Sequence, residues 1–316
     1  MNKFSSVALA VLVLLLGAPG GGYAAGLRAS PALAHTAAVV ESASTRLPAL
    51  AAVPAAGVYP VHTNIVSTTF WVGEVFNASA ADGSQVCSTY NRQWAFRHTG
   101  VNLGAVPPSA SACAGSIYGG CDGVSSGTAG SFTCSTEART AADGYFPQHQ
   151  PPPKENPFYL DLPFDDVHDP IAFQQRCQVI PWAAADNAAT GINHCADPGY
   201  SYMKNRWVKL TGPGGRVCYG QNEDAGPSSG TAYHDAAYVF GANDARPANP
   251  NYSADVGQGA GLDVSPALNG CLGFAELNGP TTASAGPLRT AQVCRRDRGS
   301  PCRRPPASVR PASRYP

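Results

Sequence analysis

The sequence predicts a mainly β protein of short strands, long disulfide-pinned loops and two short helices. Three observations indicate this class. The 316-residue chain has 34 Gly and 28 Pro, and only 13% of its residues are charged, against roughly 25% in an average globular domain. Several short runs are rich in β-branched and aromatic residues, with turn residues between them. Ten cysteines at irregular spacing suit loops held by disulfides.

Most of the expected elements follow from local residue patterns. The β-branched and aromatic runs predict strands at 65–76, 85–90, 158–162, 177–180, 206–211, 216–219 and 261–264. The turn Gly212-Pro-Gly-Gly215 should join 206–211 and 216–219 into a hairpin. Asp169-Pro170 and Ser265-Pro266 each place a capping side chain before a proline, so short helices are expected over 170–176 and 267–274. Residues 99–157, dense in Gly, Ser and Pro, should form loops.

The N-terminus has the pattern of a secretory signal. Lys3 precedes the apolar run 7–16, and Gly22-Tyr23-Ala24 offers small residues for cleavage after Ala24. An apolar run of this length is too short to span a bilayer. We therefore expect a soluble secreted protein, extracellular or periplasmic, with no membrane partner. The expected parts are a signal peptide (1–24), an Ala/Pro-rich linker or pro-segment (25–60), a β domain (61–288) and a disordered Arg/Pro-rich tail (289–316).

The net charge of zero sums two unlike parts. Residues 26–288 carry 12 Lys and Arg against 20 Asp and Glu, a net charge of −8, whereas 289–316 carry eight Arg and one Asp. An acidic body lacks the cations that neutralise phosphates, so we expect no nucleic-acid partner. The tail has two interpretations. It is either a basic arm that binds an anionic wall polymer, or a disordered end from a shifted reading frame that replaced the native last strand.

The cysteine pattern indicates an oxidising compartment. No close C-x-x-C pair typical of zinc occurs, so we expect no metal and no cofactor. Cys294 and Cys302 should bond each other or nothing, and the connectivity of the other eight cannot be deduced from spacing. The eight that we expect to pair within 61–288 are Cys87, Cys113, Cys121, Cys134, Cys177, Cys195, Cys218 and Cys271.

Two segments after the hairpin resemble a known superfamily. The first is Gln221-Asn-Glu-Asp-Ala-Gly-Pro227 and the second is Gly261-Leu-Asp-Val-Ser-Pro-Ala-Leu-Asn-Gly-Cys-Leu-Gly273. They resemble the double-psi β-barrel proteins of the rare lipoprotein A, expansin and family 45 glycoside hydrolase group. Rare lipoprotein A-like domains carry D-R-G-P and then D-L-S-x-A-A and L-G. The matching residues are Asp224, Gly226 and Pro227, with Ala225 in place of Arg, and then Asp263, Ser265, Ala267, Leu272 and Gly273.

The resemblance implies a double-psi β-barrel that acts on polysaccharide. In family 45 hydrolases an H-F-D-L segment supplies the general acid, and Asp263 is its positional match. The family's base is an Asp just after an early Tyr, but Ser88-Thr-Tyr-Asn91 ends in Asn91. An amide cannot accept a proton from water, so the family's base is missing at this position. Tyr118-Gly-Gly-Cys-Asp-Gly123 is similar to the loop that follows in the family.

Glycoside cleavage needs one carboxylic acid that is kept neutral and a second carboxylate across the sugar. Asp263, in an apolar strand beside a helix start, is the candidate acid. Asp224, Asp122 and Glu223 are the candidates for the second group. The alternative is structural: Asp263 bonds backbone amides at the helix start, and Asp224 fixes its turn. The candidate sugar-binding aromatics, each of which is also a candidate core residue, are Tyr90, Trp94, Tyr118, Tyr233 and Tyr238.

A further acidic run, Asp161, Asp165, Asp166 and Asp169, offers oxygen ligands for Ca²⁺ but lacks EF-hand spacing, so we interpret it as a solvated loop.

These patterns favour a monomeric, secreted protein that acts on cell-wall glucan or peptidoglycan. One hypothesis is a glycoside hydrolase or lytic transglycosylase with Asp263 as its acid. The second is a non-catalytic expansin-like module that binds and loosens wall polymer, which Asn91 favours. The third is an inhibitor or interaction protein on the same barrel.

Overall fold

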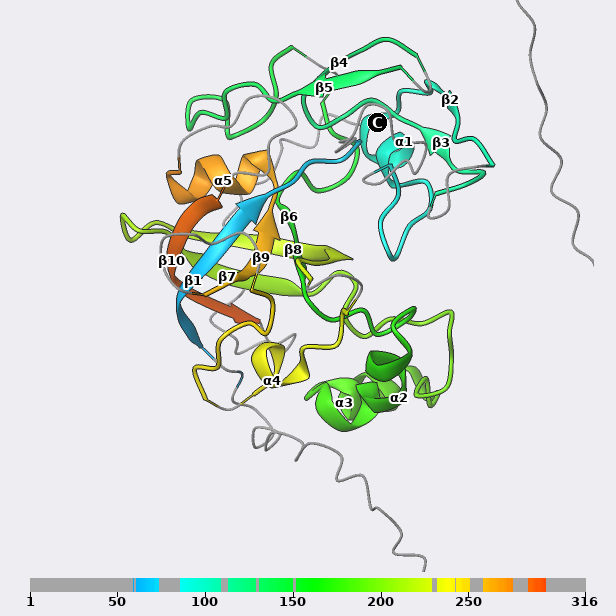
Figure 1. Cartoon of the computed structure of the whole chain (residues 1–316), viewed down its shortest axis with the longest axis vertical. Helices are drawn as coiled ribbons and strands as arrows, with labels where there is room; N and C mark the ends of the chain where they lie inside the picture. The colour runs from blue at the N-terminus through cyan, green and yellow to red at the C-terminus, as the bar shows by residue number, and fades with distance from the viewer. Residues whose placement is uncertain are drawn as a thin grey trace, which may run out of the picture. The chain divides into compact units, whose positions relative to one another are not determined.

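The structure is a computed structural model (Figure 1). The chain divides into two compact units, residues 1–46 and residues 47–316. None of the residues of the first unit is described here. The described residues are 59, 61–73, 86–108, 113–128, 131–149, 152–228, 232–241, 243–250, 258–274 and 284–293. The expected signal peptide, all of the expected linker except Tyr59, and Cys294 and Cys302 lie outside them.

Six strands close into a mixed barrel in the order β1-β10-β7-β8-β6-β9 (Figure 1). Strands β1 and β9 pair in parallel, as do β6 and β8, and the other four pairs are antiparallel. The mainly β class and the β7–β8 hairpin are therefore confirmed. The strands are β1 (His62–Thr69), β6 (Tyr159–Leu162), β7 (Trp207–Thr211), β8 (Val217–Ala225), β9 (Ala260–Val264) and β10 (Ser284–Val293).

Strand β10 runs five residues beyond the boundary expected for the barrel domain, since Arg289–Val293 were assigned to the tail. It pairs with β1 on one side and β7 on the other, so it closes the barrel. Its sequence, SAGPLRTAQV, contains Gly, Pro and Ala, which are depleted in strands. Pairing on both sides therefore decides its conformation more than its own residues do.

Two of the helices begin where the caps were expected. The Asp169 carboxylate accepts hydrogen bonds from the first-turn amides of α2 (Pro170–Val179), and Ser265 Oγ accepts one from Leu268 in α5 (Pro266–Leu272). The described residues contain three further helices, which local patterns did not indicate. They are α1 (Trp94–Thr99), α3 (Ala183–Thr190) and α4 (Ala236–Val239).

Two expected strands are wrong, and the strand expected over 65–76 ends early, because β1 ends at Thr69 and residues 70–73 are not in a strand. Residues 177–179 end helix α2, because Arg176 is fully buried and Cys177 is bonded to Cys195, so tertiary contacts override local β propensity. Within 85–90, the described residues 86–90 form turns with one bridge between Ser88 and Asn91.

A loop-rich lobe lies between β1 and β6 in the chain. Its short strands are β2 (Gly104–Ala105), β3 (Ile117–Tyr118), β4 (Val124–Ser126) and β5 (Thr133–Ser135). They pair as two small sheets, β2 with β3 and β4 with β5. Trp71, Trp94, Tyr118 and Phe132 form the centre of a second hydrophobic core here, which also includes Tyr159 of β6.

Four disulfides confirm the expected pairing of the eight body cysteines, and none of the described cysteines is free. The bonds are Cys87–Cys113, Cys121–Cys134, Cys177–Cys195 and Cys218–Cys271. Two of them pin the lobe, one joins α2 to the loop that follows α3, and one joins β8 to α5. In the part of the chain that the structure describes, no helix is long and apolar enough to cross a membrane.

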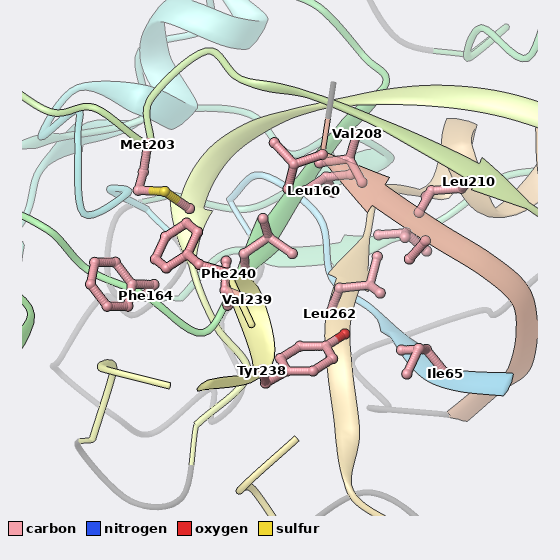
Figure 2. Packing of buried hydrophobic residues seen from close by; sticks show 14 of the residues in the cluster. Ile65, Leu160, Phe164, Met203, Val208, Leu210, Tyr238, Val239, Phe240 and Leu262 are labelled. Atoms are coloured by element: carbon pink, nitrogen blue, oxygen red, sulfur yellow. The ribbon is translucent and has the colours of Figure 1, made fainter. Parts of the chain in front are cut away.

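The main core is built from alternate residues of the barrel strands. Figure 2 shows Leu160 of β6 and Leu262 of β9 packed among Val208, Leu210 and Tyr238. Because side chains alternate along a strand, Asp161 and Asp263 lie on the face opposite to Leu160 and Leu262. The pairing that builds the core therefore also sets two carboxyl groups side by side.

Candidate functional site

Strands β8, β6 and β9 place one carboxyl group each in a row across the barrel. The register pairs Asp161 with Asp224 on one side and with Asp263 on the other. The Asp263 amide donates a hydrogen bond of 2.8 Å to Asp161 Oδ1. We call these three residues the acidic row. The row brings together two of the three expected catalytic residues, Asp263 and Asp224, and adds Asp161.

Asp161 is the inner member of the row. Its side chain is buried, whereas Asp224 and Asp263 are half-buried. Gly226 leaves the space that Asp161 occupies, because a Cβ atom at Gly226 would lie 2.5 Å from Asp161 Oδ2. The glycine of the D-A-G-P segment is thus required by the close approach of a carboxyl group from a neighbouring strand.

Asp224 is held by backbone amides. Its Oδ1 accepts hydrogen bonds of 2.8 Å from the amides of Thr89 and Ala225. Thr89 lies in the turn 88–91, directly after Cys87, whose disulfide to Cys113 anchors this turn. Three segments far apart in the sequence, around residues 89, 224 and 263, therefore meet at the row.

Burial raises the pKa of every member of the row. The pKa of Asp263 rises to about 7 and that of Asp224 to about 6, and in Asp224 the Thr89 and Ala225 amides oppose the rise. The pKa of Asp161 lies well above its usual range, because burial is reinforced by the neighbouring Asp263 and Asp224. The Asp161 and Asp263 side chains also share a hydrogen bond, which favours the charged form of Asp263.

Tyr90 and Tyr233 lie near the row. Both are half-buried, and burial raises the pKa of each phenol, with the charge of Asp224 acting in the same direction. The Tyr90 hydroxyl donates to the backbone oxygen of Phe164 at 3.4 Å. These are the two expected sugar-binding aromatics that the structure brings to the acidic row.

Trp94 and Tyr118 lie elsewhere. Both are buried in the second core, where Trp94 packs against Tyr159 with ring centroids 5.1 Å apart. Tyr118 packs against Phe132 at 5.7 Å. Tyr238, the fifth candidate, is buried in the main core (Figure 2). These three rings are therefore core residues, which was the alternative to sugar binding for each of them.

Asp122 belongs to a separate buried cluster. Its Oδ1 is 2.9 Å from Arg139 Nη2, and its Oδ2 accepts a hydrogen bond of 3.1 Å from the Tyr159 hydroxyl. Arg139 also donates to the Asp122 backbone oxygen at 2.8 Å. These contacts join the lobe to β6, so the observed role of Asp122 is to hold the two parts of the fold together.

Glu223 precedes Asp224 in β8 at an irregularity in the β6–β8 pairing, where Leu160 pairs with Asn222 and Asp161 with Asp224, so Glu223 has no register partner in β6. Burial raises its pKa to about 7, and Lys204 opposes that rise. It remains a titratable group near the site without being a member of the row.

The acidic run from Asp161 to Asp169 is not the solvated loop that its sequence suggested. All four carboxylates are buried, and Asp161 lies inside strand β6. Asp166 accepts from the Ser201 hydroxyl and the Tyr202 amide at 2.6 Å each, and Asp169 caps α2. The sequence does contain a signal for a special role of Asp161, because a single charged residue inside the otherwise apolar strand Tyr159–Leu162 is unusual. Among the described residues, no group of three or more His, Cys, Asp or Glu is arranged to hold a metal ion.

Comparison with family models, curated proteins and solved structures finds no match to the chain. What the acidic row can do therefore has to follow from its own geometry and chemistry.

Proposed function

We propose that the protein is secreted and cleaves a cell-wall polysaccharide, glucan or peptidoglycan, as a glycoside hydrolase or lytic transglycosylase. The observation that carries this proposal is the acidic row: two half-buried carboxyl groups of raised pKa on either side of a buried third. Carboxyl groups whose protonation is tuned by burial are what glycoside cleavage requires.

We further propose that the barrel has the double-psi topology. A closed six-stranded mixed barrel with two parallel pairs, β1·β9 and β6·β8, supports it. The meeting of the Asp224 turn, the Asp263 strand and the turn 88–91 also supports it, because the residues that resemble the superfamily lie in these three segments. The four disulfides favour an oxidising, extracellular environment.

Asp263 acts as the general acid. A pKa of about 7 leaves Asp263 protonated at slightly acidic pH, so it can donate that proton to the glycosidic oxygen as the carbon–oxygen bond breaks. Asp224, with a pKa of about 6, ionises first. It takes a proton from the attacking water, whose oxygen bonds to the anomeric carbon; in a lytic reaction a hydroxyl of the sugar itself replaces the water. Asp161 orients Asp263 through their shared hydrogen bond.

The strand spacing is compatible with these roles. Asp224 and Asp263 are separated by two strand-to-strand steps of about 4.8 Å, which places their backbones about 9–10 Å apart. Carboxyl groups of inverting glycosidases lie roughly 6.5–9.5 Å apart, which leaves room for the attacking water. Tyr90 and Tyr233 supply aromatic faces beside this gap, and such faces suit the apolar sides of sugar rings.

A non-catalytic, expansin-like role is the second candidate, and Asn91 is the observation that favours it. Asn91 lies in the turn that holds Asp224, but its Oδ1 accepts a hydrogen bond from the Gln93 amide at 3.0 Å and cannot serve as a base. In the catalytic proposal Asp224 takes over that role.

The test is the release of soluble sugar products from cellulose, chitin and peptidoglycan between pH 4 and 9. Reducing ends report hydrolysis, and mass spectrometry reports the anhydro sugars of a lytic reaction, which have no reducing end. We expect a bell-shaped pH profile with its maximum between about 6 and 7, because activity falls below the pKa of Asp224 and above that of Asp263. Asp263→Asn and Asp224→Asn should each abolish release, and Asp244→Asn, in an exposed carboxylate outside the row, should not. Binding to an insoluble polymer without release from any of them would support the expansin-like role. Neither binding nor release would support an interaction protein.

A further inference from the structure

The acidic row lacks the cations that accompany other carboxylates of this protein. Asp122 is ion-paired with Arg139, Asp186 with Arg206, and Asp244 lies 3.4 Å from Arg246. In contrast, no Lys, Arg or His among the described residues lies within 4.0 Å of a carboxyl oxygen of Asp161, Asp224 or Asp263. The charged groups that raise the pKa values in the row are other carboxyl groups, those of the row itself and of Asp165. Any carboxylate that ionises in this row therefore has no cation beside it, and a partly buried charge without a partner is unfavourable.

A second observation at the same row is a pair of buried polar atoms without hydrogen-bond partners. Thr68 of β1 pairs in register with Asp263, so the two side chains lie on one face of neighbouring strands. Thr68 is 1% exposed, and its hydroxyl has no hydrogen-bond partner. Asp263 Oδ1 is likewise buried without a partner. Buried polar atoms without partners are uncommon in folded proteins, and here two of them are neighbours beside an uncompensated carboxyl group.

We propose that the substrate brings the missing positive charge, and that the acidic row binds a polysaccharide with free amino groups. The chemical class is a de-N-acetylated amino-sugar polymer, of the kind obtained by deacetylating chitin or the glycan of peptidoglycan. This inference rests on the proposed function and narrows its substrate. An ammonium group offers three donors and a unit charge to the row, and charge-assisted hydrogen bonds to carboxylates are about twice as strong as neutral ones.

The same charges disfavour other polymers. A uronic acid polymer would place carboxylates against Asp224 and Asp263, and like charges in a partly buried site repel strongly. A neutral glucan could use Tyr90 and Tyr233 but would leave the row without its counter-charge. A basic peptide would satisfy the charge but offers no sugar ring for the two tyrosines. The amino sugar alone satisfies both the carboxyl groups and the aromatic rings.

The test compares two oligosaccharides of the same backbone that differ in N-acetylation and therefore in charge. Binding of a fully acetylated chitin hexamer and of its fully deacetylated counterpart is measured by calorimetry at one pH near neutrality, with EDTA present to exclude divalent cations. An oligogalacturonate hexamer and an oligolysine hexamer complete the panel. The proteins are the full chain, Asp224→Asn, Asp263→Asn and the control Asp244→Asn, whose carboxylate has its own cation. Every variant keeps the same arginine-rich C-terminal segment, so its contribution to binding is common to all.

We expect the deacetylated hexamer to bind at least about tenfold more tightly than the acetylated one. The preference should shrink at high salt, fall to less than about threefold in Asp224→Asn and Asp263→Asn, and persist in Asp244→Asn. Equal affinity for the two hexamers, a preference for oligogalacturonate, or oligolysine binding as tight as the amino sugar would overturn the inference. Cleavage of neutral polymers in such a case would leave the proposed function standing. Failure to bind or cleave any polysaccharide would instead remove the proposed function itself.

Discussion

Asp263→Asn should make the protein less sensitive to rising pH. The pKa of Asp263 is raised from 3.8 to about 7 in the folded protein, so the folded state holds a proton that the unfolded state has already lost. Between those two values stability falls as pH rises, by up to 1.36 kcal/mol per pH unit. The wild type therefore loses about 4 kcal/mol between pH 4 and pH 8 through this one group, and above pH 7 the loss is complete. An amide at residue 263 does not titrate and removes the loss.

The quantity to measure is the difference in unfolding free energy between variant and wild type, at pH 4 and at pH 8. Replacing the carboxyl group also weakens the hydrogen bond to Asp161, at a cost of about 1 kcal/mol at both pH values. We therefore expect the variant to be about 1 kcal/mol less stable at pH 4 and about 3 kcal/mol more stable at pH 8. Urea unfolding with the disulfides intact, followed by tryptophan fluorescence, reports both values, since Trp71 and Trp94 are buried.

Asp244→Asn is the matched control, with the opposite sign. Hydrogen bonds from Thr63 and the charge of Arg246 hold the pKa of Asp244 below its usual range against the effect of burial. Its contribution is therefore present above the unfolded pKa and lost as pH falls. The control should be less stable than wild type at pH 8, and the deficit should shrink toward pH 3. If Asp263→Asn shows a stability difference that does not change with pH, or one that becomes more unfavourable as pH rises, the raised pKa and the proposed proton on Asp263 are both refuted.

Three further substitutions test the surroundings of the row. Gly226→Ala places a methyl group 2.5 Å from Asp161 Oδ2, so we expect a loss of about 1–3 kcal/mol in urea unfolding and a clear fall in polysaccharide cleavage; unchanged activity would show that Asp161 does not position the acid. Arg139→Met leaves Asp122 buried without its cation and should cost about 3–5 kcal/mol, part of which Asp122→Asn should restore in the double variant. Tyr159→Phe removes the hydroxyl that donates to Asp122 and should cost about 1–3 kcal/mol of unfolding free energy. The pH optimum for cleavage should stay the same, because the Asp122 cluster is separate from the acidic row, and a shifted optimum would contradict that separation.

Local sequence signals were sufficient for the elements whose ends are set by their own residues. The Gly212–Gly215 turn predicts the β7–β8 hairpin, and the Asp169 and Ser265 caps predict the starts of α2 and α5. Local signals fail where a contact with a distant part of the chain determines the conformation of a segment. Residues 177–179 are helical because Cys177 is bonded to Cys195, and β10 is a strand because two other strands pair with it.

The candidate site shows the same division. Asp224 and Asp263 stand in the two segments that carry the resemblance, and both were predicted as candidate catalytic residues. Asp161 was not, because its role depends on the register of β6 between β8 and β9, and the register is a property of the closed barrel. The aromatic candidates divide similarly. Tyr90 and Trp94 are four residues apart, yet Tyr90 is half-buried near the row and Trp94 is fully buried in the second core, a difference that composition cannot supply.

The outer members of the row differ because their surroundings treat the charged form differently. Two backbone amides, from Thr89 and Ala225, donate to Asp224 and favour its anion. Asp263 Oδ1 has no donor, and the hydrogen bond from Asp161 only partly offsets the effect of burial. Asp224 is therefore the group that loses its proton first and Asp263 the one that keeps it, which is the order that an acid and a base need when they act together. Because the Thr89 amide reaches Asp224 from a turn anchored by Cys87–Cys113, the loop-rich lobe contributes to the difference between the two carboxyl groups on which the proposed roles rest.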